Sequence, residues 1–145
     1  MRPDHADEPT REPRASGTRA LDRVTAHTLA LEAAERAWDD AVTMKKEFLL
    51  RDVARQLVRA AGSIAANIAD GYARRSPRDR VRFYEYALSS SEEVESWYNS
   101  GRRVLSAESL DDRTARLTSI RRLLLVMIRN ERQGKNWNSP HRPRP

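Results

Sequence analysis

The residues best suited to ligand binding in this 145-residue chain are five arginines that lie close together. A guanidinium group carries a permanent charge and presents paired N–H donors that match a phosphate. The arginines surround the predicted start of a helix, where free backbone N–H groups and the helix dipole also attract anions. Interleaved tyrosines can stack on unpaired bases. The set predicts a nucleic-acid contact and consists of Arg74, Arg75, Arg78, Arg80 and Arg82, with Tyr72, Tyr84 and Tyr86.

Further arginines lie away from the predicted buried side of the last helix and extend this basic surface. The chain has 27 basic and 21 acidic residues, a net charge of +6, which favours an anionic partner such as RNA. The alternative is a solvated bundle end balanced by acids of neighbouring helices. The additional residues are Arg122, Arg129 and Arg132, and Arg102 and Arg103 are candidates to join them.

Catalytic motifs are not found. Glu92, Glu93 and Glu95 suggest acid–base chemistry or a di-metal site, but a bundle site of that kind needs repeated Glu-x-x-His pairs. The absence of cysteine excludes disulfides and thiolate chemistry. No phosphate loop, GxSxG elbow or HExxH is present. We expect no enzymatic activity, no metal and no cofactor; the only histidines are His5, His27 and His141.

A second constellation lies in the segment 56–76, where residues 60–69 carry no charge. Such a helix is predicted to be hidden from water on most sides, either in the interior or between subunits. One predicted face holds the small residues Gly62, Ala65 and Ala69 with Val58, and would allow close approach of another backbone. A polar stripe beside it is predicted to hydrogen-bond across helices or subunits and set their register; a ligand site is the alternative. This stripe comprises Gln56, Arg59, Ser63, Asn67 and Asp70.

These residues require helices to position them. Apolar residues recur at spacings of three and four, few glycines or prolines interrupt residues 18–133, and no alternating strand pattern occurs. The first predicted helix covers about 18–45 and the second about 47–70, with Gly71 as a left-handed C-terminal residue. The predicted buried seam of the first is Val24, Thr28, Leu31, Glu35, Trp38 and Val42, and that of the second is Val53, Leu57, Ala61, Ile64 and Ile68.

The third helix has the clearest start, with Ser76 as N-cap, Pro77 at the first position and Asp79 three residues after the cap. Its predicted seam is Phe83, Ala87, Ser90, Val94, Trp97, Gly101 and Leu105. Ser109 and Asp112 form a predicted cap pair for the fourth helix, which ends near Arg132. Its predicted buried line is Leu117, Ile120, Leu124 and Met127.

The sequence therefore predicts an all-α, antiparallel up-down-up-down four-helix bundle over residues 18–133. Residues 1–17 and 134–145 are predicted to be disordered tails. The longest apolar run, 123–128, is far shorter than the roughly 20 residues that cross a bilayer. We expect no membrane partner and a cytoplasmic location.

Two motifs resemble a known family. The segment QLVRAAGSIAANIADGYARRS, followed by RFYEYALSSSEEVES, is similar to the signature of the four-helix-bundle proteins encoded in 23S rRNA intervening sequences. Asp70 stands where that family usually has Glu, Ser89 where it has Gly, and its proline-bearing first connection is replaced by MKKEFLLRD. The matching positions are Gln56, Leu57, Arg59, Ala60, Ser63, Ile64, Asn67, Ile68, Ala69, Gly71, Arg74, Ser76, Phe83, Ala87, Ser90 and Glu93.

The resemblance implies a small bacterial protein without known enzymatic activity. A related protein, the accessory variability determinant of diversity-generating retroelements, is a homopentamer that binds nucleic acid and a reverse transcriptase. By resemblance we expect a homo-oligomer, a pentamer, that binds RNA through its arginine surface. The alternatives are an accessory subunit of a reverse transcriptase and a pure protein-interaction module.

Overall fold

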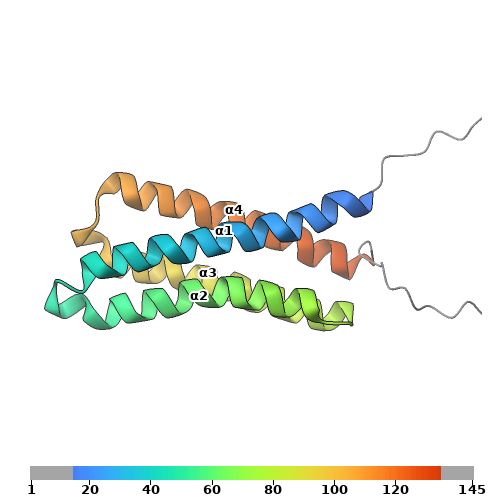
Figure 1. The fold of residues 1–145 in the computed structure, drawn as a ribbon, viewed down its shortest axis with the longest axis horizontal. Helices are drawn as coiled ribbons and strands as arrows, with labels where there is room; N and C mark the ends of the chain where they lie inside the picture. The colour runs from blue at the N-terminus through green and yellow to red at the C-terminus, as the bar shows by residue number, and fades with distance from the viewer. Residues whose placement is uncertain (1–14, 135–145) are drawn as a thin grey trace, which may run out of the picture.

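The computed structural model describes residues 15–134, which form four long helices that run alternately in opposite directions (Figure 1). No strand occurs in this part of the chain. The predicted all-α up-down-up-down bundle is therefore confirmed; most of both predicted tails lies outside the described residues. The helices are α1 (Ala15–Met44), α2 (Arg51–Ala73), α3 (Pro77–Gly101) and α4 (Ala107–Arg132).

Short connections join the helices at both ends of the bundle. The α1–α2 and α3–α4 connections lie at the same end (Figure 1) and contain the 3₁₀ helices η1 (Phe48–Leu50) and η2 (Arg102–Val104). At the other end, the predicted cap of α3 is confirmed, because Ser76 Oγ accepts a hydrogen bond from the Asp79 backbone N–H at 3.1 Å. The predicted cap of α4 is wrong by about one turn: Ser106 is the N-cap and accepts from the Ser109 N–H.

Small residues form the buried side of α1. The core positions of this helix are Ala26, Ala30, Ala33, Ala37, Ala41 and Met44. The predicted seam of α1 is wrong, because its large apolar members lie on the outside: Val24 is 62% exposed, Leu31 48%, Trp38 61% and Val42 39%. Alanine side chains let neighbouring helices approach closely, so the bulky residues occupy the opposite side of the helix.

The other helices bury larger side chains. All four predicted core residues of α4 are buried, and so are the predicted α2 residues except Val53, which is half-buried. In α3 the predicted seam is only partly correct, because Tyr84, Ser91 and Tyr98 are buried while their predicted neighbours Phe83, Ser90 and Trp97 are half-buried. Burial of the two large tyrosine rings stabilises the fold by more than burial of their hydroxyl groups costs.

Gly71 does not terminate α2 in the predicted left-handed conformation. It lies buried within the helix, and among the described glycines a positive φ occurs at Gly134. A Cβ atom at position 71 would lie 2.6 Å from Cε1 of Tyr84. This glycine therefore permits α2 and the Tyr84 ring to pack closely.

A buried ion pair links three helices near the end that contains η2. Asp40 of α1 accepts hydrogen bonds from Tyr98 Oη of α3 at 2.7 Å and from Arg113 Nε of α4 at 2.7 Å. Arg113 Nη2 donates to the second carboxylate oxygen at 3.1 Å. Burial raises the pKa of Tyr98 above its ordinary value of 10, and the hydrogen bond to Asp40 raises it further. This cluster fixes the relative positions of α1, α3 and α4.

We predict that Asp40→Ala lowers the free energy of unfolding by about 3 kcal/mol, because it removes the acceptor of Tyr98 and of two Arg113 nitrogens, and leaves Arg113 only its ion pair with Asp112. Urea unfolding followed by circular dichroism measures the change. Asp111→Ala is the matched control, because Asp111 is exposed, and should change stability by less than about 0.5 kcal/mol. Equal effects of the two substitutions would contradict the assigned role of Asp40.

Tyr98 also predicts an alkaline limit to stability. Its folded-state pKa is raised, so above about pH 10 the unfolded chain releases this proton while the folded chain retains it. Stability should therefore decline as the pH rises above 10. In Tyr98→Phe the decline should be shallower, although the variant is less stable at pH 8 because it lacks the hydrogen bond. Parallel stability curves for the two proteins would refute the assignment.

Candidate nucleic-acid interface

The clustered arginines lie where α2 ends and α3 begins. This end of the bundle also contains the start of α1 and the end of α4 (Figure 1). The connection continues directly from the last turn of α2, and Ser76 then caps α3. The sequence places arginines in the connection itself and on the first turns of α3, so they surround a helix N-terminus. Arg74, Arg75, Arg78 and Arg82 are exposed there.

Few carboxylates of the described chain lie close enough to neutralise the exposed arginines. No carboxylate of residues 15–134 lies within 4 Å of Arg74, Arg75 or Arg78. Arg82 lies 3.5 Å from Asp79 on the same helix. The guanidinium groups of Arg74 and Arg82 lie 4.4 and 5.6 Å from the centroid of the Phe83 ring. Contact with the Phe83 ring holds these two guanidinium groups in place and leaves their positive charge unchanged.

Arg80 has a different environment from the other members of the cluster. Its side chain is only 12% exposed, and Nη1 donates to the backbone carbonyls of Arg74 and Arg75, both at 2.9 Å. Its Nε lies 3.0 Å from the buried carboxylate of Glu131 on α4. Arg80 therefore caps backbone carbonyls at the end of α2 and links this end to α4. Its guanidinium group is not positioned to bind an external phosphate.

The tyrosines of the cluster also divide into two classes. Tyr84 is fully buried, and burial raises the pKa of its hydroxyl group above 10. Tyr72 is 60% exposed, with the guanidinium of Arg23 4.7 Å from its ring centroid. Tyr86 is 49% exposed and contacts Phe83 edge to face. Only the two exposed rings are accessible to an unpaired base.

The arginines of α4 extend the basic surface unevenly. Arg122 and Arg129 are exposed, and no carboxylate of the described chain lies within 4 Å of either. Arg132 instead forms an ion pair with Glu85 of α3. Arg102 and Arg103 lie at the opposite end of the bundle, in η2, beside an open hollow.

The polar stripe of α2 faces α3 within the same chain. Ser63 Oγ donates to Ser90 Oγ at 2.7 Å, and Arg59 pairs with Glu93 while its Nε donates to Gln56 at 2.8 Å. Asn67 donates to the Ser63 backbone carbonyl at 2.8 Å, and Asp70 is exposed. Only the contacts of Ser63 and Arg59 therefore join α2 to α3. Those of Gln56 and Asn67 lie within α2.

Sequence reasoning missed two buried ion pairs, Asp40–Arg113 and Arg80–Glu131. The spacing of Tyr84, Ser91 and Tyr98, which recur every seven residues, signals the buried side of α3 but neither ion pair. Within residues 15–134, no three metal-ligating side chains come together. No helix of this region has the length and apolarity to span a bilayer.

Comparison with protein families identifies the fold. The model of the 23S rRNA-intervening sequence protein family matches residues 24–125, which include most of all four helices. The chain belongs to this family. The match contains the Gln56–Ser76 segment and the start of α3, so the arginine cluster lies within the shared region of this 23S rRNA-intervening sequence protein.

A solved structure supports the same family assignment. The chain is similar to a protein of unknown function from the S23 ribosomal protein family of Bacteroides thetaiotaomicron, with 26% sequence identity and a TM-score of 0.66. The similarity covers 74% of this chain and 98% of the Bacteroides protein. No curated protein matches the sequence significantly.

The different environments of Arg80 and Arg78 predict different losses of stability when each is replaced. Arg80→Gln should lower the free energy of unfolding by about 1 to 3 kcal/mol, because it removes donors to two helix-end carbonyls and leaves Glu131 without this cation. Arg78→Gln should change it by less than about 0.5 kcal/mol. Thermal unfolding of the two variants measures the difference, and equal melting temperatures would contradict an internal role for Arg80.

Proposed function

We propose that this 23S rRNA-intervening sequence protein is a non-enzymatic, self-associating bundle that binds RNA in the cytoplasm through the α2–α3 end. The observation that supports RNA binding is the pair of exposed arginines, Arg75 and Arg78, with no carboxylate of the described chain within 4 Å. Exposed cations that are not used in internal pairs remain available for phosphates.

The surroundings of this pair favour nucleic acid over a small anion. Arg74 and Arg82 lie around the Phe83 ring, and the exposed ring of Tyr86 contacts Phe83 edge to face. Cations combined with accessible aromatic rings suit an RNA that presents both phosphates and unpaired bases. Recognition of this kind is sensitive to salt and weakly selective for sequence.

The proposal uses fewer arginines than the sequence suggested. Arg80 donates to backbone carbonyls and Arg132 pairs with Glu85, so neither contributes a free charge. Arg122 and Arg129 remain as a secondary contact on α4. An RNA bound at the α2–α3 end would reach these two arginines only if it were longer than the site at that end.

The test is a salt titration of binding to a fluorescein-labelled RNA hairpin with an unpaired loop. The intact chain should bind at low salt, and affinity should fall steeply as salt rises. Arg75→Gln with Arg78→Gln should reduce the slope of log K against log salt by about 2, one for each arginine that no longer binds a phosphate. Affinity at 0.1 M salt should fall roughly tenfold or more.

The matched control removes the same charge from the opposite end. Arg102→Gln with Arg103→Gln should leave most of the affinity and the slope unchanged. No binding by the intact chain at low salt would refute RNA binding altogether. Equal losses of affinity in the two double variants would show general charge attraction and would refute the assigned location.

A further inference from the structure

An exposed apolar ridge runs along α1. Its members, Val24, Leu31, Trp38 and Val42, are between 39% and 62% exposed. Their spacing of seven, seven and four residues puts them on one side of the helix, as at the contact positions of a coiled coil. Such a ridge is costly to leave in water, and contiguous exposed apolar surface marks an interaction site.

A groove of small residues lies beside the ridge, on α2. Gly62, Ala66 and Ala69 are exposed there, and a Cβ atom at position 62 would have no neighbour within 4 Å. Nothing in the described chain therefore requires glycine at this position, although glycine weakens a helix interior. Approach of another backbone would account for it.

The boundary between α1 and α2 is hollowed at two places. One hollow of about 310 Å³ lies between Val24 and Thr28 of α1 and Ala69 and Tyr72 of α2. The second, of about 280 Å³, lies near the other end and is lined by Trp38, Val42 and Val58 among others. Both are mainly apolar, so the face combines a ridge of large side chains with an adjacent groove.

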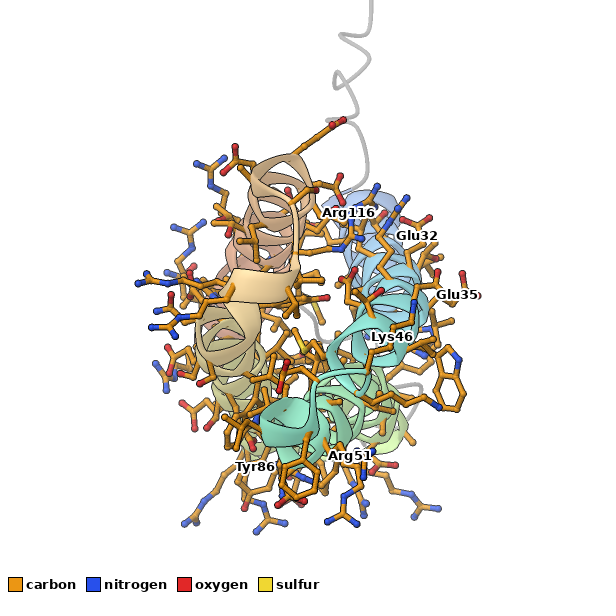
Figure 2. The ribbon with its side chains drawn as sticks, turned by 90° about the vertical axis from the view of Figure 1, so that its left-hand side faces the viewer. Glu32, Glu35, Lys46, Arg51, Tyr86 and Arg116 are labelled. Atoms are coloured by element: carbon orange, nitrogen blue, oxygen red, sulfur yellow. The ribbon has the colours of Figure 1, made fainter. Side chains whose placement is uncertain are left out.

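Opposite charges flank the ridge and the groove. On α1, exposed Glu35 lies in the line of the ridge, between Leu31 and Trp38, and exposed Asp39 lies beside it. No basic group of the described chain lies within 4 Å of either carboxylate. Figure 2 shows Glu35 pointing away from the bundle, whereas Glu32 lies near Arg116 of α4, at 3.2 Å. On α2, exposed Arg51 and Arg55 border the second hollow. Arg55 also pairs with exposed Asp52 of the same helix at 2.8 Å.

We propose that this face binds α1 of a second copy of the chain. The ridge of one copy packs over the Gly62, Ala66 and Ala69 groove of the other, and the acidic residues of α1 lie along the arginines at the edge of the groove. The inference rests on the proposed self-association and identifies the surface that produces it.

Self-complementarity favours a second copy over an unrelated partner. One chain supplies both large and small apolar surfaces, and it supplies both signs of flanking charge. The reverse side of the bundle lacks a comparable feature, since the large exposed apolar residues assigned to α3 and α4 are Tyr86 and Leu125. The uncharged run 60–69 of α2 is also explained, because the second copy shields the part of this helix that the single chain leaves exposed.

The experiment measures mass by sedimentation and light scattering for two interface variants. Leu31→Glu with Trp38→Glu disrupts the ridge, and Gly62→Glu with Ala69→Glu fills the groove. All four positions are exposed, so the folded single chain should tolerate both changes, which circular dichroism checks. The wild type should be oligomeric, and each variant should have the 16.6 kDa mass of one chain. The association constant should fall on the order of 100-fold.

Mixing the two variants tests the pairing itself. The intact ridge of one variant and the intact groove of the other leave one functional contact, so the mixture should form a complex of two chains. Leu125→Glu, on the reverse side, is the control and should assemble like the wild type.

Each result that would contradict the proposal refutes a different part of it. Wild-type protein of 16.6 kDa would refute self-association and this interface together, leaving RNA binding to its own test. An oligomer that survives both pairs of substitutions would refute the interface alone. Monomeric variants that do not combine on mixing would overturn the packing of α1 against α2.

Discussion

The packing of this bundle depends on the alanines that α1 presents to the core. A helix has one stripe for burial, and Ala26, Ala30, Ala33, Ala37 and Ala41 occupy it. Small side chains bring the neighbouring backbones close and leave no room for the bulky residues of the same helix, which therefore lie outside. Tight packing within one chain and an apolar ridge on its surface thus have the same cause.

Two surfaces of the molecule carry separate functions in this interpretation. The α2–α3 end concentrates arginines that internal pairs leave free, while the face of α1 and α2 combines apolar surface with balanced charge. Assembly through the second surface would repeat the first in every subunit. Several arginine ends in one particle would bind a long RNA more tightly than a single end, because the later contacts form at high effective concentration.

The fold was largely predictable, because the period of the apolar residues and the Ser76–Pro77 cap are local signals. The buried side of α1 was not, since alanine is a weak hydrophobic marker and the larger residues formed the more conspicuous seam. In α3, the sequence predicts Tyr84 as a base-stacking residue and leaves Tyr98 out of the seam, although both rings are buried in the core. The arginine cluster was located from its sequence spacing, but the inward orientation of Arg80 depends on Glu131, 51 residues further along the chain. Such long-range ion pairs leave no local pattern.

The most direct test of the account is the accessibility of the α1 ridge as a function of protein concentration. The chain contains no cysteine, so Thr28→Cys introduces one thiol beside the ridge and Ser89→Cys one on the reverse side. The rate of thiol alkylation should fall with rising protein concentration at position 28 and remain constant at position 89. Rates that are independent of concentration at both positions, in a protein shown to be oligomeric, would contradict the account.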